Sequence, residues 1–206
     1  MHFPSSHPVI LQKVSALRDA ETRPAMFRQL VRELSILLAY EATADLPTVP
    51  TVVLTPLGAS PGHALADRIA IVPILRAGLG MADGLLEVLP DAEVWHIGLF
   101  RDEETLKPTE YYNKIHDRCR AAVAIVVDPM LATGGSAIRT CEILRASGVA
   151  RIKFISLIAA PEGIKRFAVR YPDVPIHVGA VDERLTDVGF IYPGLGDAGD
   201  RQFATS

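Results

Sequence analysis

The chain has 206 residues, of which 49% are hydrophobic and 22% charged, and its formal net charge at pH 7 is -3. This composition is typical of a globular chain that buries a sizeable core, and the length suits one domain of about 100–200 residues. A negative net charge without a basic run argues against a dedicated nucleic-acid-binding protein.

Neither the cysteines nor the N-terminus indicates an exported or membrane protein. Cys119 and Cys141 form no Cys-x-x-Cys motif and favour a reducing compartment over a disulfide framework. Residues 1–20 lack an apolar core flanked by basic residues, and no stretch approaches the roughly 18 apolar residues of a membrane helix. The histidines are scattered without the spacing of a zinc site. We therefore expect a cytoplasmic protein with no membrane partner.

The first predicted elements are a helix, a strand and a loop. Apolar residues recur at spacings of three and four over residues 22–40. This spacing predicts a helix with Thr22 as its N-cap and Pro24 in its first turn. Residues 49–54 predict a short strand. Residues 55–67, with two prolines and two glycines, are expected to form a turn or loop.

From residue 69 onward, apolar runs alternate with helical patterns. Continuous runs rich in Ile and Val are typical of parallel strands buried on both faces. The alternation predicts one α/β domain over 1–206, with a doubly wound, mainly parallel sheet and helices on both faces. Residues 187–206 are expected to fold back as a C-terminal cap. The runs are 69–75, 94–100, 121–127, 152–159 and 176–181, and the helical patterns are 81–89, 136–146 and 161–169.

The strongest candidate site follows the run 121–127. Asp128 ends this run, and Thr-Gly-Gly-Ser at 133–136 leads into a helix. Glycines let backbone amides approach a ligand, and a helix N-terminus adds unpaired N–H groups, so the loop suits a phosphate monoester. Asp128 beside it suits two ribose hydroxyls. The loop lacks the lysine of P-loop nucleoside triphosphatases. The alternative is a helix capped by Ser136 or Thr133 that binds no ligand.

Three further segments are weaker signals. Arg76, with Gly78 and Gly80, follows the run 69–75, and its forked donors match phosphate oxygens. The alternative there is a plain strand–helix turn with an exposed arginine. On composition alone, residues 100–108 indicate a solvated loop and residues 189–201 an irregular C-terminal turn.

These segments resemble the type I phosphoribosyltransferases, and the resemblance covers nearly the whole chain. Asp-Pro-Met-Leu-Ala-Thr-Gly-Gly-Ser at 128–136 is similar to that family's phosphoribosyl-diphosphate loop. Most members have two adjacent acids there, whereas Pro129 at the second position resembles the uracil-specific branch. Residues 189–201 resemble the uracil-binding segment of that branch. Residues 51–66 do not match the family's hairpin arm, so the resemblance does not carry the family's dimer geometry over to this chain.

The resemblance implies an enzyme of UMP salvage that joins uracil to 5-phosphoribosyl-1-diphosphate and releases diphosphate. It implies catalytic roles for Asp128, Arg76, Arg101 and Asp197. The implied ligands of the diphosphate sugar are Arg76, Arg101, Asp128, Pro129, Met130, Leu131, Ala132, Thr133, Gly134, Gly135, Ser136 and Asp197. The implied uracil ligands are Ile191, Gly196, Asp197 and Ala198, with backbone groups reading the base edge.

The resemblance also implies a cofactor and partners. Mg²⁺ is expected, carried mainly by the diphosphate, with Asp197 contributing through water. Residues 100–108 resemble a mobile loop over the site. The family suggests a homodimer or larger homo-oligomer, and GTP activates some members; the sequence leaves both open. No general base for uracil N1 is evident, and Asp197 is a candidate by location only.

Three alternative functions remain at this point. The chain could act on another base, such as orotate or hypoxanthine. It could be a regulator that senses UMP or the diphosphate sugar and binds RNA or a partner, although no basic face is evident. It could be an inactive paralogue, which the intact Arg76, Asp128 and Asp197 disfavour.

Overall fold

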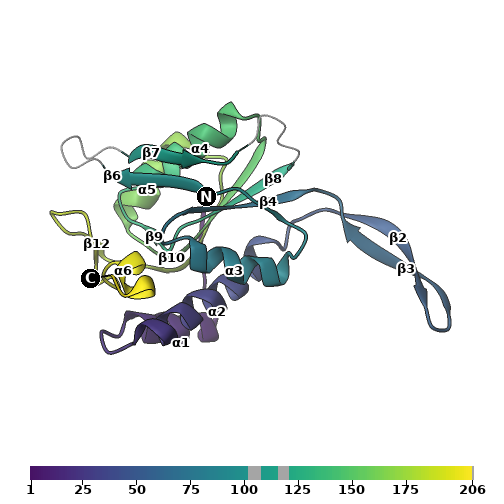
Figure 1. The fold of residues 1–206 in the computed structure, drawn as a ribbon, viewed down its shortest axis with the longest axis horizontal. Helices are drawn as coiled ribbons and strands as arrows, with labels where there is room; N and C mark the ends of the chain where they lie inside the picture. Colours follow the sequence, from purple (N-terminus) through teal and green to yellow (C-terminus); the bar gives the residue numbers. More distant parts are fainter. Residues whose placement is uncertain (102–107, 116–120, 206) are drawn as a thin grey trace.

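A mainly parallel sheet forms the centre of the molecule (Figure 1). The computed structural model describes residues 1–101, 108–115 and 121–205. In this central sheet, neighbouring strands are parallel except β6 and β7, which are antiparallel. Short β5 (Glu93–Val94) pairs with β4, and β9 (Met130–Leu131) pairs with β10. The strand order is β1 (His2–Pro4), β11 (Ile176–Val181), β10 (Arg151–Ala159), β8 (Val123–Val127), β4 (Ile69–Leu75), β6 (Ile97–Arg101) and β7 (Pro108–Asn113).

Helices cover both faces of the sheet, which confirms the predicted fold class. Successive side chains of a strand point to opposite faces. Accordingly, Ile71 packs in one apolar core with α1, α2 and α3, and Val72 packs in a second core with α4 and α5. The helices are α1 (Pro8–Arg18), α2 (Pro24–Ala42), α3 (Leu79–Val88), α4 (Gly135–Ala146) and α5 (Pro161–Arg170).

The predicted strands lie close to the observed ones, with one division. The runs 69–75 and 176–181 coincide with β4 and β11. The predicted strand 94–100 is instead divided into β5 and β6. The register with β4 is the same on both sides of the break, which lies opposite Pro73, a residue with no N–H to donate. Within the break the Trp95 N–H still donates to the Ile71 carbonyl at 2.9 Å, and its buried indole donates to Glu93 at 3.0 Å. The chain then resumes its pairing with β4 further along.

The start of α2 differs by one residue from the prediction. The N-cap is Arg23 and not Thr22, while Pro24 lies in the first turn as expected. The Thr22 hydroxyl donates to the Ala16 carbonyl at 2.7 Å, so it ties the α1–α2 connection together and is unavailable as a cap.

The predicted loop over 55–67 is wrong, because most of it forms a strand. Strands β2 (Thr48–Thr55) and β3 (Gly58–Leu65) make an antiparallel hairpin that projects away from the sheet (Figure 1). Each strand of a two-stranded ribbon has one unpaired edge, so a proline that cannot donate a hydrogen bond is tolerated there. Pro61 in β3, opposite Val52, is such a residue. The prolines and glycines therefore did not stop the strand.

The C-terminal segment folds back beside α2 and α3 (Figure 1). It contains β12 (Arg184–Leu185), β13 (Ile191–Tyr192) and helix α6 (Ala198–Phe203). α6 contacts α2. Among the residues that the structure describes, no helix is long and apolar enough to cross a membrane.

Candidate active site

The loops that follow β4 and β8 meet α6 around a cavity of about 420 Å³. The carboxyl ends of parallel strands are where open α/β sheets bind ligands, because the connecting loops and helix N-termini gather there. The cavity therefore has the position that the sequence predicted. Its polar lining comes from Arg76 after β4, Tyr111 on β7, Asp128 after β8, Ser136 on α4 and Asp197 before α6.

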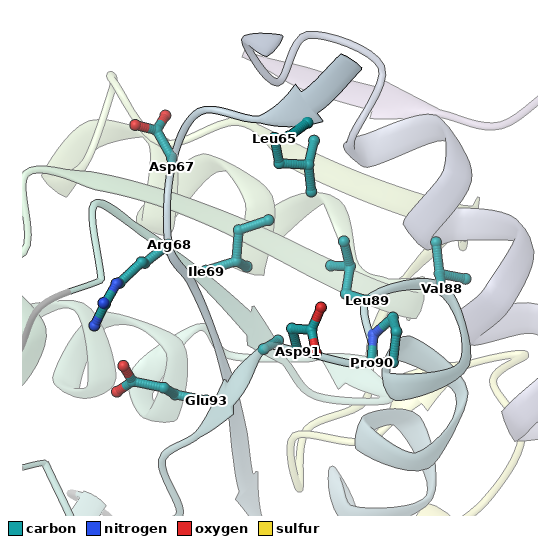
Figure 2. Close-up of a pocket in the computed structure, with 11 residues that line it drawn as sticks. Leu65, Asp67, Arg68, Ile69, Val88, Leu89, Pro90, Asp91 and Glu93 are labelled. Carbon is teal, nitrogen blue, oxygen red and sulfur yellow. The ribbon is translucent and has the colours of Figure 1, made fainter. Parts of the chain in front are cut away.

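A larger cavity, of about 570 Å³, lies at the amino end of β4 (Figure 2). Asp67, Asp91 and Glu93 line it together with Arg68. The C-terminal end of α3, at Val88, also borders it. Carboxylates and the negative end of a helix repel phosphate groups. The smaller cavity is therefore the better candidate for a phosphorylated substrate.

The loop 128–136, the expected phosphate loop, ends at a helix start that leaves its amides available. Gly134 is the N-cap of α4, with φ 76°, and no side chain among the described residues caps this helix. The first hydrogen bond of the helix runs from the Ile138 N–H to the Gly134 carbonyl, at 2.9 Å. The expected alternative, a cap by Ser136 or Thr133, is therefore wrong. The loop surrounds a recess of about 70 Å³, lined by Asp128, Met130, Leu131, Ala132, Thr133, Gly134, Gly135, Ser136 and Ala137.

Gly163 in α5 supports this loop from behind, and the sequence reading missed it. A Cβ at Gly163 would lie 2.1 Å from the Ala132 carbonyl oxygen and 2.7 Å from that of Leu131. Gly134 makes the reciprocal contact, since its Cβ would lie 3.1 Å from the Gly163 carbonyl oxygen. Glycine inside a helix costs about 1 kcal/mol relative to alanine, so its presence was a usable signal of close packing.

We expect Gly163→Ala to raise at least tenfold the KM for the diphosphate sugar that the resemblance implies, because the new methyl group must displace the loop backbone. At a helical glycine without such a contact, alanine should instead leave the KM unchanged and raise the Tm, because alanine favours the helix. Steady-state kinetics and thermal unfolding together decide between these cases. A variant with an unchanged KM and a raised Tm would contradict the close contact.

Asp128 points into the cavity from the end of β8, and its environment is unfavourable for charge. Burial, and to a smaller extent the charge of Asp197, raise its pKa to about 7, against a weak opposing hydrogen bond from the Met130 N–H. That bond measures 3.4 Å. The carbonyl of the neighbouring Pro129 accepts the N–H groups of Leu157 and Ile158, both at 3.1 Å. The Pro129 carbonyl thus ties the connection between β8 and β9 to β10.

Arg76 and Asp197 lie on two sides of the same cavity. Arg76 is 59% exposed and its Nη2 lies 3.6 Å from Oδ1 of Asp200 on α6. Asp197 is the N-cap of α6, and its Oδ1 accepts the Asp200 N–H at 2.9 Å. Arg101 ends β6, but its side chain lies outside the described residues, and so do residues 102–107 of the expected mobile loop 100–108. The structure thus brings Arg76, Asp128 and Asp197 together.

The predicted uracil ligands lie in a rigidly held loop next to this cavity. Gly194 and Gly196 have φ values of 68° and 81°, which favour glycine. Ile191 and Ala198 are buried. Sequence reasoning missed the side chains that hold this loop: Arg18, Asp182, Arg201 and Gln202. Arg18 is 176 residues from the Gly194 carbonyl that it bonds, so no local pattern could reveal it.

The carboxylates of the cavity suit a metal that is bound mainly by its substrate. No group of three His, Cys, Asp or Glu side chains that could hold a metal ion occurs in 1–101, 108–115 and 121–205. Among the described residues, Asp128 and Asp197 are the carboxylates that line the cavity. Mg²⁺ keeps several waters and often binds through one or two carboxylates and substrate phosphates. These residues therefore fit an Mg²⁺ ion that is bound with a diphosphate.

Comparison with known proteins relates the chain to one family. The sequence profile of the family described as "Uracil phosphoribosyltransferase" matches residues 4–205. A protein of that name from Roseiflexus sp. (strain RS-1) is 54% identical over 201 residues, which covers 98% of this chain and 97% of that protein.

Solved structures share the fold. The AQ2163 protein from Aquifex aeolicus has 40% sequence identity and a TM-score of 0.94, covering 100% of this chain and 99% of the other. An adenine phosphoribosyl transferase from Trypanosoma brucei, solved with AMP, pyrophosphate and ribose-5-phosphate, has a TM-score of 0.59 at 12% identity. It covers 95% of this chain and 88% of its own, and it supports the fold alone.

Proposed function

This chain belongs to the uracil phosphoribosyltransferase family, and we propose that it converts uracil and 5-phosphoribosyl-1-diphosphate to UMP and diphosphate in pyrimidine salvage. One observation supports this most strongly. Asp128, Arg76 and the uncapped start of α4 border one cavity. The C-terminal segment beside it lies within residues 4–205, which match the family. Strands from β1 to β11 share the central sheet, which has an apolar core on each face. We therefore also propose a single domain over 1–206 with a base-binding cap at 187–206.

In this proposal each group of the diphosphate sugar has a partner. The amides of residues 134–136 and the hydroxyls of Thr133 and Ser136 bind the 5′-phosphate. Asp128 accepts hydrogen bonds from the ribose hydroxyls. Arg76 and Arg101 neutralise charge on the leaving diphosphate. Mg²⁺, bound with the diphosphate and with Asp197 through water, would supply further charge neutralisation there.

Uracil is recognised by backbone groups in the C-terminal cap. It presents two carbonyl acceptors with an N–H donor between them, and the backbone of Ile191, Gly196 and Ala198 offers the complementary groups. Cytosine would leave buried polar groups unpaired, and discrimination of roughly 10⁴-fold is achievable in that way. N1 bonds to the anomeric carbon as the bond from that carbon to diphosphate breaks, through a transition state with oxocarbenium character, and the N1 proton is released to solvent.

The direct test mixes the purified protein with Mg²⁺, uracil and 5-phosphoribosyl-1-diphosphate and measures UMP. Formation of UMP that depends on all components is expected. Parallel reactions with orotate, hypoxanthine and cytosine should give no nucleotide. Retention of RNA that weakens with salt, without UMP formation, would favour a regulatory role instead. Adding GTP to the same assay shows whether this chain is among the members that GTP activates.

We expect kcat/KM for the diphosphate sugar to fall as the pH drops through about 7, because the Asp128 carboxylate becomes protonated there. The protonated carboxyl loses the charge that favours the ribose contact and the positive transition state. The phosphate of the substrate also titrates near pH 6, so the profile of Asp128→Asn is the control. If both proteins have the same profile, the substrate and not Asp128 causes the fall.

We propose that the chain forms a homodimer or larger homo-oligomer through the hairpin of β2 and β3. Residues 47–66 contain no Lys, Arg, Asp or Glu. Val52, Leu54 and Leu57 are 70%, 87% and 101% exposed. Exposed apolar surface of this kind marks an interaction site. Light scattering should give a mass of at least two chains; a monomer at micromolar concentration would contradict the proposal. We also propose that the protein works in the cytoplasm, because its two cysteines form no Cys-x-x-Cys motif and favour a reducing compartment.

A further inference from the structure

A partly buried ion pair lies against residues 191–198, which we call the base-binding loop. Arg18, the last residue of α1, donates from Nη1 to Oδ2 of Asp182 at 2.7 Å and from Nη2 to Oδ1. The Asp182 side chain is 2% exposed, and that of Arg18 is 24% exposed. The contact therefore joins two distant parts of the chain in a forked geometry that only arginine provides.

The same two side chains hold Gly194 from both sides. The Gly194 N–H donates to Oδ2 of Asp182 at 2.8 Å, and the Gly194 carbonyl accepts from Nη1 of Arg18 at 2.8 Å. Gly194 lies between Ile191 and Gly196, whose backbone groups we propose to read uracil. Since its φ is 68° and both of its polar backbone groups are bonded, the loop has little freedom to shift at this point.

A second arginine attaches the neighbouring residue to the same end of α1. Arg201 donates from Nη1 to the carbonyls of Leu17 at 2.8 Å and Leu195 at 2.9 Å. Its guanidinium lies 4.5 Å from the centre of the Phe27 ring. The loop is thus fixed to the α1–α2 layer, whereas the phosphate loop is supported by α5 on the other face.

We propose that Arg18 and Asp182 are positioning residues for uracil: they set the backbone of the base-binding loop without touching the substrate. This inference rests on the proposed function. Backbone groups cannot correct a displacement by changing rotamer, so a shift of the loop directly misplaces its donors and acceptors. A misplacement of about 1 Å can cost on the order of 100-fold in rate. Because the phosphate loop has separate supports, the diphosphate sugar should be affected little.

The test uses two conservative substitutions and one matched control. Arg18→Lys keeps the charge but loses the fork, and Asp182→Asn keeps an acceptor for Gly194 but loses the charge. The control is Arg145→Lys. Arg145 also lies in the last turn of a helix and bonds an aspartate, Asp173, together with the carbonyl of Val149 at 3.1 Å. None of these residues lines the active-site cavity.

We expect both test variants to raise the KM for uracil about tenfold or more, with the KM for the diphosphate sugar within twofold of wild type. The control should change neither KM. Amide hydrogen exchange should become faster over residues 191–198 and remain unchanged over residues 133–137. Circular dichroism and thermal unfolding accompany each variant.

Several outcomes would overturn the assignment. They are equal changes in both KM values, an unchanged KM for uracil, or unchanged exchange over 191–198. Loss of the native circular dichroism spectrum in both test variants would show that the pair serves folding alone, and would overturn it too. If the wild-type protein makes no UMP, the proposed function fails, while the exchange measurement still reports whether the pair holds the loop.

Discussion

Asp128→Asn should lower kcat about 100-fold or more while the fold is retained. Asparagine has the same shape and preserves an acceptor for the Met130 N–H, so the loop backbone has no reason to move. What it lacks is the negative charge that holds the ribose hydroxyls and favours the positively charged transition state. Asp91→Asn, in the larger cavity at the other end of the sheet, is the control and should be silent.

The same substitution should stabilise the ligand-free protein at high pH. The pKa of Asp128 in the folded protein is about 7, against an ordinary value of 3.8, so its ionisation opposes folding above pH 4 and does so fully above pH 7. This difference corresponds to about 4 kcal/mol. Because the carboxylate still contacts water in the open cavity, we expect a gain of about 2 kcal/mol at pH 8.

Chemical denaturation at pH 8 and pH 4 measures this effect together with the kinetics. The variant should be more stable than wild type at pH 8 and equal to it at pH 4. Unchanged kcat would remove Asp128 from the mechanism. If the variant is less stable than wild type at pH 8, the Asp128 carboxylate stabilises the fold, and the proposed loss of stability in exchange for function is wrong.

Arg76→Ala should raise the KM for 5-phosphoribosyl-1-diphosphate at least about 30-fold, with a smaller effect on the KM for uracil. Removing one partner of a charge-assisted contact costs about 2–5 kcal/mol, which converts to roughly 30-fold or more. Stability should hardly change, because the exposed 3.6 Å contact with Asp200 contributes little.

The control for this variant is Arg32→Ala. The Arg32 side chain is 57% exposed and pairs with Glu87, so it matches Arg76 in exposure and in having a carboxylate partner. It lies outside the active-site cavity and should leave both KM values unchanged. A KM for the diphosphate sugar that rises equally in both variants would indicate a general effect of removing surface charge.

The elements buried in the sheet were predicted well because their patterns are local. β4 and β11 coincide with the predicted runs, and α4 begins one residue before the predicted pattern. Elements at the surface carried weaker signals. In α1 the buried face is narrow, and Val9 and Leu11 are exposed on the other side, so the helix was not recognised. β7 is an exposed edge strand with a polar sequence, so it lacks the apolar run of a buried strand. The proline and glycines of β3 favoured a loop, so the hairpin was not recognised.

The same division applies to the candidate site. Residues that act through a local motif, such as Asp128 and Arg76, could be found because they follow buried strands. The residues that hold the loops in place could not, since their partners lie far along the chain. Arg18 and Asp182 are 164 residues apart, and neither lies in a recognisable motif. Gly163 lies between these two cases. A glycine within a helix indicates close packing, but the sequence does not identify the segment that packs against it.

The central claim is that the uncapped start of α4 binds the terminal phosphate of the sugar while Asp128 holds the ribose. A crystal structure of the protein with UMP tests it most directly. We expect the 5′-phosphate against the amides of residues 134–136 and a ribose hydroxyl within hydrogen-bonding distance of the Asp128 carboxylate. A nucleotide bound elsewhere, for example in the cavity beside Asp91 and Glu93, with the phosphate loop empty, would contradict the account.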